Sequence, residues 1–123
     1  MWAVRRPWHA DAVSDEIDYL TVPEVAELLA LPLGRVHQLL RDGELAAVRR
    51  DGVLRVPADF FDGDAVVRGL AGTLTVLRDQ GYSDEEAVRW LFTPDDSLPG
   101  TPMQAMRENR LRAVRRRAQV LGF

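Results

Sequence analysis

The stretch TVPEVAELLALPLGRVHQLLRDGELAAVRRDGVLRVP, residues 21–57, decides the fold of this 123-residue chain. It opens on Thr21 with Glu24 three residues later, which is the spacing of a capping box at the start of a helix. Apolar residues then recur at the helical period until Leu31-Pro32. A proline there cannot continue the backbone hydrogen bonds, so the stretch predicts a first helix that ends at this point.

A second helix is predicted from about Leu33 to Arg41, because apolar residues again fall on one side and Gly43 follows as a natural left-handed cap. Its predicted buried stripe consists of Leu33, Val36, Leu39 and Leu40. Polar residues of the helix point away from this stripe and would face solvent or a ligand.

A β-hairpin is predicted next, since residues 45–50 and 53–56 are β-prone runs joined by Asp51-Gly52, and Pro57 ends the second run. Two short helices, a tight turn and a hairpin that carries arginines form the outline of a winged helix-turn-helix. In that arrangement the outer face of the second helix can enter the major groove of double-stranded DNA. The candidate DNA contacts from this pattern are Arg35, Gln38 and Arg41 on the helix and Arg49, Arg50 and Arg55 on the hairpin. The alternative is an ordinary small α+β core with solvated arginines.

The rest of the chain is predicted to be helical. Ser83 and Glu86 form a second capping box, and Thr101-Pro102 is an N-cap followed by a proline in the first turn. The last helix would have an apolar stripe of Leu111, Val114, Ala118 and Leu121. The fold class is therefore mainly α with a small β-hairpin, divided into an N-terminal arm (1–18), a winged helix-turn-helix domain (19–62) and a small C-terminal helical domain (63–123).

Composition excludes several classes of site and protein. The chain has no Cys and two His, so thiolate chemistry and a histidine-based zinc site are not expected. No apolar run is long enough for a membrane span, and the first residues lack the apolar core of a secretory signal. No catalytic constellation, metal site or cofactor motif is found. We therefore expect a cytoplasmic protein without enzymatic activity.

Charge is unevenly distributed, although the net charge is only −3. Residues 107–123 hold six Arg and one acid. Arg112, Arg115 and Arg116 are therefore candidates for secondary phosphate contacts. The alternative is that these cations only favour the dipole at the C-terminal end of their helix.

The first half resembles the excisionase and MerR-type winged-helix family over residues 20–61. The matching positions are Thr21, Glu24, Ala26, Leu29, Val36, Leu39, Gly43, Leu45, Ala47, Arg49 and Arg55-Val56. The resemblance implies that Arg35, His37, Gln38 and Arg41 face the groove and that Arg49, Arg50 and Arg55 are wing contacts. One departure is Ala-Leu-Pro-Leu-Gly at 30–34, where many relatives have Gly-Val-Ser. This departure removes a hydroxyl N-cap from the second helix.

The second half extends the match. It contains GTLTVL at 72–77, GYSDEEA at 81–87, WLF at 90–92, LPGTP at 98–102 and RRRAQ at 115–119. Together with the first half it resembles the actinobacterial winged helix-turn-helix DNA-binding family typified by a mycobacterial substrate of the Ser/Thr kinase PknL. This resemblance implies a transcriptional or nucleoid-associated regulator. It also implies a Ser/Thr kinase as a partner, but residues 1–20 contain no Thr, and Ser14 is their one hydroxyl residue besides Tyr19.

A function of a different class stays open. The order Trp-Leu, loop, Thr-Pro, Met-x-x-Met and closing helix also resembles the toxin-binding domain of some antitoxins. The chain would then be a protein-interaction module with weak DNA binding or none.

If the chain does read DNA, a single domain makes few base contacts, so sequence specificity favours a homodimer or tandem sites.

Overall fold

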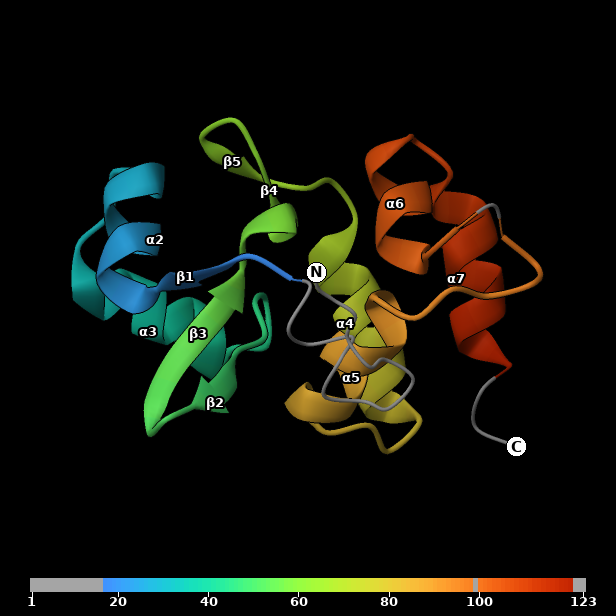
Figure 1. Ribbon diagram of the computed structural model, residues 1–123, viewed down its shortest axis with the longest axis horizontal. Helices are drawn as coiled ribbons and strands as arrows, with labels where there is room; N and C mark the ends of the chain where they lie inside the picture. The colour runs from blue at the N-terminus through green and yellow to red at the C-terminus, as the bar shows by residue number, and fades with distance from the viewer. Residues whose placement is uncertain (1–16, 99, 121–123) are drawn as a thin grey trace, which may run out of the picture.

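The computed structural model describes residues 17–98 and 100–120 and consists mainly of helices with a small antiparallel sheet (Figure 1). The fold class expected from the sequence is confirmed: a winged helix-turn-helix is followed by a set of C-terminal helices. Most of the predicted N-terminal arm, residues 1–16, lies outside the described residues.

The helix-turn-helix consists of α2 (Val22–Leu29) and α3 (Leu33–Arg41). The predicted capping box is present: Thr21 N donates to Glu24 Oε1 at 2.7 Å, and Glu24 N donates to Thr21 Oγ1 at 3.3 Å. Helix α2 ends where Ala30 takes a left-handed conformation, with a φ of 57°. The tight turn that follows brings α3 back against α2, so the apolar stripes of the two helices face each other.

The wing is a three-stranded antiparallel sheet in the order β1-β3-β2. Strands β2 (Val48–Arg50) and β3 (Val53–Pro57) form the predicted hairpin. Its two turn residues both have positive φ, 54° at Asp51 and 79° at Gly52, as a type I′ turn requires. The third strand, β1 (Tyr19–Thr21), was not predicted. It has only three residues and depends on pairing with β3, which is far away in the sequence.

The described residues of the C-terminal half form four helices: α4 (Leu70–Asp79), α5 (Asp84–Leu91), α6 (Pro102–Arg107) and α7 (Leu111–Gln119). The caps at Ser83 and Thr101 form as predicted. The apolar pattern of Leu74, Val76 and Leu77 predicts a helix from Thr73 to Gln80, and α4 begins three residues earlier, at Leu70. The sequence predicts a short helix over residues 58–61, and the structure forms a 3-10 turn there (Ala58–Phe60). The sequence also predicts a turn over residues 62–64, which lies inside a small unpredicted hairpin of β4 (Phe61–Asp62) and β5 (Ala65–Val66).

One hydrophobic core joins the two halves of the described chain. Phe60, at the end of the winged part, is fully buried and stacks on Phe92, which follows α5, at a ring separation of 6.1 Å. Arg107 on α6 donates to the carbonyl oxygens of Asp59 and Phe61 at 2.9 and 2.6 Å. The separation into domains at residues 62 and 63 stays a prediction.

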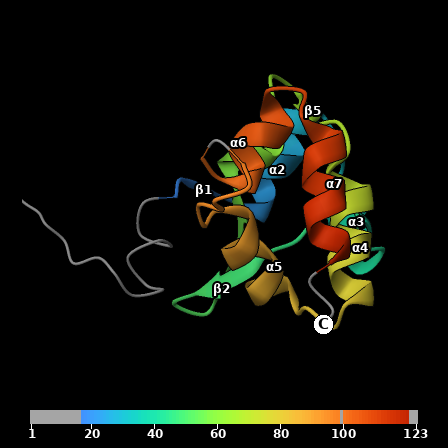
Figure 2. The ribbon, with the colours of Figure 1, turned by 90° about the vertical axis from the view of Figure 1, so that its right-hand side faces the viewer.

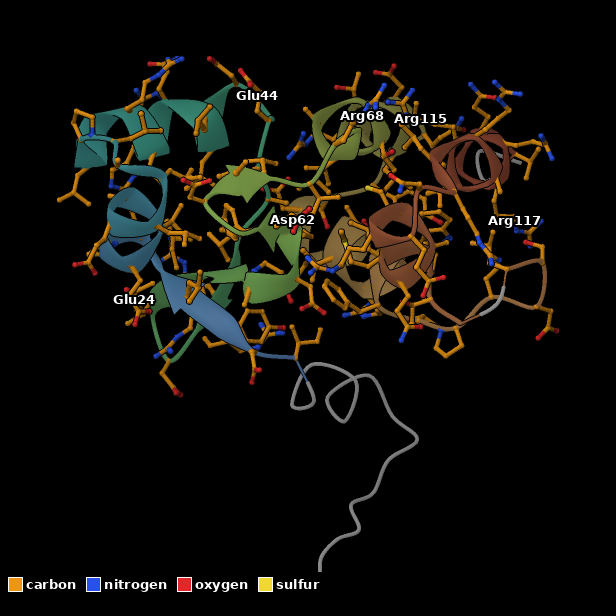
Figure 3. The ribbon with its side chains drawn as sticks, turned by 90° about the horizontal axis from the view of Figure 1, so that it is seen from above. Glu24, Glu44, Asp62, Arg68, Arg115 and Arg117 are labelled. Atoms are coloured by element: carbon orange, nitrogen blue, oxygen red, sulfur yellow. The ribbon has the colours of Figure 1, made fainter. Side chains whose placement is uncertain are left out.

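Helix α7 packs along α4 through the predicted stripe. Val114 and Ala118 are fully buried and Leu111 is partly buried, whereas Leu121 lies outside the described residues. Figures 2 and 3 show that α3, α4 and α7 follow one another along one side of the molecule. This side therefore combines the second helix of the helix-turn-helix with the arginine-rich last helix.

Candidate nucleic-acid interface

Helix α3 is anchored by a few apolar residues and leaves most of its surface exposed. Val36 is fully buried, and Leu39 and Leu40 are partly buried. Leu33 was predicted to be buried, but half of its surface is exposed. This prediction was wrong because Leu33 lies at the edge of the stripe, and one partner helix covers only the middle of such a stripe.

The exposed face of α3 carries every candidate residue that was predicted there. Arg35, His37 and Arg41 are exposed and Gln38 is partly exposed. Gly34 lies on the same face and has open space around its Cα. Within residues 17–98 and 100–120, neither Arg35 nor Arg41 has a carboxylate partner within 4 Å. This face can therefore accept an anionic partner without first breaking an ion pair.

A short chain of hydrogen bonds arranges the polar side chains at the end of α3. Gln38 Nε2 donates to Asp42 Oδ1 at 2.8 Å, and an Arg41 Nη donates to Gln38 Oε1 at 2.8 Å. Gln38 is thus fixed from both sides and holds the guanidinium of Arg41 against the helix. An Arg fork that is oriented in advance loses less rotamer entropy when it binds a base edge or a phosphate.

The start of α3 has the unusual cap that the sequence indicated. Pro32 is the N-cap residue, and no side chain accepts a hydrogen bond from the first turn. The backbone N–H groups of Arg35 and Val36 both reach the carbonyl of Pro32. The positive end of the helix dipole at this turn is therefore not neutralised by a side chain, which favours an anion nearby.

The three wing arginines have different environments. Arg49 is exposed, and its Nη1 donates to the carbonyl of Gly52 at 3.0 Å, which holds the side chain along the hairpin turn. Arg55 lies in the central strand, partly buried, and its Nε is buried without a hydrogen-bond partner in the described part of the chain. Arg49 is thus the wing arginine whose placement best suits a contact with DNA.

Arg50 instead connects the wing to the C-terminal half. Its Nη1 lies 3.2 Å from Glu85 Oε1 on α5, and its guanidinium lies 5.9 Å from the centre of the Tyr19 ring. Burial lowers the pKa of Arg50, but the hydrogen bond and the charge of Glu85 more than offset this, and the pKa is raised above its ordinary value. Arg50 therefore stays charged and fixes the wing against α5.

The arginines of α7 also differ. Arg112 and Arg116 are exposed. Arg117 forms an ion pair with Asp95, with 3.0 Å between Nε and Oδ2. Arg115 is partly buried against α4, where its Nε donates to Thr73 Oγ1 at 3.0 Å (Figure 3). The candidate phosphate contacts are therefore not equivalent, because Arg115 already has a structural partner.

The structure also brings a residue that the sequence reasoning missed close to these arginines. Arg68 precedes α4 and lines the same surface hollow as Arg112 and Arg115. No local pattern could have indicated this, because it depends on how α7 packs on α4.

Residues 17–98 and 100–120 contain neither a cluster of metal ligands nor a membrane-spanning helix. No group of three or more His, Cys, Asp or Glu side chains there could hold a metal ion. No helix in that part of the chain has the length and apolar character needed to cross a membrane.

Comparison with known proteins gives matches to both halves. Residues 6–61 match the family model of the winged helix-turn-helix domain of the DNA-binding protein Rv2175c, and residues 67–122 match that of the Rv2175c C-terminal domain of unknown function. The DNA-binding protein Rv2175c of Mycobacterium tuberculosis is 44% identical over 122 residues, which cover 89% of this chain and 83% of that protein. The NMR structure of Rv2175c matches with a TM-score of 0.81 and 41% identity, over 88% of this chain and 83% of that one. The chain therefore belongs to the Rv2175c family, in which a winged helix-turn-helix domain is joined to a C-terminal domain of unknown function.

Proposed function

We propose that this protein binds double-stranded DNA, reads its sequence with α3, and acts as a transcriptional or nucleoid-associated regulator in the cytoplasm, without enzymatic activity. The observation that carries the proposal is the exposed face of α3. It presents Arg35, His37, Gln38 and Arg41 to solvent, and its arginines have no carboxylate partner among the described residues. Membership of a family with a DNA-binding winged domain supports the same function.

The side chains of α3 suit different parts of a DNA site. Arg41 can donate two hydrogen bonds to a guanine edge, and Gln38 can pair with adenine once it releases Asp42. Leu33, exposed at the start of the helix, suits an apolar contact with the methyl group of thymine. Arg35 and His37 lie on the flanks, where they can contact phosphate.

The wing would contribute mainly through Arg49, which lies at the hairpin turn. Arg50 would act indirectly, by holding the wing against α5. A contact of Arg55 with DNA stays a prediction. A homodimer on a palindromic site would double the base contacts, and we propose it as the arrangement that gives useful specificity. A Ser/Thr kinase as a partner is implied by the family resemblance alone, and Ser14 lies outside the described residues.

The alternative, a protein-interaction module with little DNA binding, is less well supported. The similar mycobacterial protein is named as DNA-binding. Salt dependence separates the two functions, because phosphate contacts weaken steeply as salt rises and apolar protein contacts do not.

The test begins by selecting bound duplexes from a random DNA library, which gives a preferred site. Affinity for that site and for random DNA is then measured for Arg41→Ala and Gln38→Ala. Each change should cost about 1–3 kcal/mol on the preferred site and less on random DNA. Arg89→Ala is the control, since Arg89 is exposed on α5 and lies outside α3 and the wing. Equal losses on both kinds of DNA would remove these two residues from base readout, and wild-type affinity in both variants would refute the role of α3.

A further inference from the structure

An open hollow of about 880 Å³ lies between α7, the end of α6 and Arg68 just before α4, outside the helix-turn-helix. We call it the α4–α7 hollow. Its lining residues are Arg68, Met106, Asn109, Leu111, Arg112 and Arg115. Half of this lining is arginine and none of it is acidic, and Figure 3 shows Arg68 and Arg115 on the same side of the molecule as α3.

Arg115 is fixed in this hollow by the first turns of α4. Its Nε donates to the hydroxyl of Thr73, which is fully buried, and an Nη donates to the carbonyl of Gly69 at 3.4 Å. The guanidinium lies directly against Gly72, where a Cβ atom would collide with it. A glycine at position 72 thus allows a cation to approach the backbone of the first turn of α4.

This placement is electrostatically unfavourable on its own. The N-terminal end of a helix carries a partial positive charge, and it favours anions rather than cations. Here Arg115 lies against that end of α4, and Arg68 and Arg112 line the same hollow. An anion in the hollow would neutralise both the arginines and the helix end.

Some arginines of the fold are already paired with acids. Arg50, Arg78 and Arg117 each form an ion pair, with Glu85, Asp84 and Asp95 respectively. In the part of the chain that the structure describes, Arg68, Arg112 and Arg115 have no carboxylate within 4 Å. Acids are not scarce, because the chain has 19 Asp and Glu against 16 basic residues. Among the described residues, the arginines of the hollow therefore resemble those of the exposed face of α3: they form no ion pair that an anion would first have to break.

We propose that the α4–α7 hollow binds a phosphate group. Planar guanidinium forks match the oxygens of phosphate in pairs, and the amide of Asn109 adds a further donor at the rim. The phosphate has two sources with the same chemistry. One is the backbone of the DNA that α3 contacts, since α3, α4 and α7 follow one side of the molecule, and this source rests on the proposed function. The other is a free phosphorylated small molecule, which does not depend on it.

The first arm of the test uses the full-length protein without DNA. Inorganic phosphate and pyrophosphate are titrated while NMR follows the amides of Gly69 and Gly72 and the Nε–H of Arg115. These signals should shift with saturation in the wild type and in Arg89→Gln. They should shift several-fold less in Arg68→Gln and Arg112→Gln. Both of these residues are exposed, so the variants should keep the wild-type fold.

The second arm measures duplex DNA binding by the same variants as a function of salt. If backbone phosphate occupies the hollow, Arg68→Gln and Arg112→Gln should each lower the salt slope by about one ion, and Arg89→Gln should leave it unchanged. If the occupant is a free ligand, the first arm alone should respond. Failure of the α3 variants to weaken DNA binding would refute the proposed function and leave the first arm unaffected. The phosphate site itself is refuted if neither arm distinguishes the hollow variants from Arg89→Gln.

Discussion

Arg78 joins α4 to the segment that follows α3, and we predict that Arg78→Ala lowers the free energy of unfolding by about 2–4 kcal/mol. Its Nη1 donates to the carbonyl of Gly43 at 2.6 Å and its Nη2 to that of Leu45 at 3.3 Å. Its Nη2 also lies 2.9 Å from Asp84 Oδ1. One guanidinium therefore joins the turn after α3, the loop before β2 and the start of α5.

The magnitude follows from the exposure of each partner. A buried acceptor that loses its donor costs about 1–3 kcal/mol, and this applies to the carbonyl of the fully buried Leu45. Gly43 is partly exposed, so water replaces part of its bond. The ion pair adds no more than about 1 kcal/mol, because the side chains of Arg78 and Asp84 are 27% and 40% exposed.

Urea unfolding, followed by the circular dichroism of the helices, measures this loss. An unchanged dependence of the unfolding free energy on urea would show that the variant exposes the same surface area on unfolding as the wild type. Arg89→Ala is the control for an exposed arginine and should change stability by less than about 0.5 kcal/mol. Arg78→Lys should recover only part of the loss, because an ammonium cannot reproduce the fork. If Arg78→Ala is as stable as the control, this connection does not stabilise the fold.

Three further predictions test individual environments. Gly69→Ala should destabilise the protein by about 2 kcal/mol or more, because Gly69 has a φ of 87° and an added Cβ would press against Leu111 of α7. Gly63→Ala is the control in the same thermal melt and should cost less, because Gly63 has a φ of 64° but open space where its Cβ would lie. Arg49→Ala should weaken binding to all DNA sequences and leave the unfolding free energy unchanged, whereas Arg50→Ala should lower the unfolding free energy. A loss of stability in Arg49→Ala together with wild-type stability in Arg50→Ala would contradict the wing geometry. The hydrogen bonds of the capping box hold the pKa of Glu24 below its ordinary value of 4.5. The contribution of Glu24 to the unfolding free energy is therefore present above pH 4.5 and is lost as pH falls through the folded-state pKa. Glu24→Gln should flatten that part of the acid unfolding curve.

The sequence by itself determined the features whose partners lie a few residues apart. The capping boxes at Thr21, Ser83 and Thr101 each join residues three positions apart, so the motif contains both partners. The Asp51-Gly52 turn depends on the backbone preferences of two adjacent residues. For the same reason the bounds of α3 agree with the prediction.

Only the tertiary structure decided which candidate arginines face solvent. Arg50 and Arg49 are adjacent in the sequence, yet the partner of Arg50 lies 35 residues away on α5. Arg112 and Arg115 lie three residues apart on the same helix, yet the hydroxyl partner of Arg115 lies 42 residues earlier on α4. A helical or strand period gives the side of an element on which a residue lies, and it does not say what covers that side. The charges of this chain could therefore be counted from its sequence, whereas the packing of α7 on α4 and of α5 on the wing decided which of them remain available to bind an anion.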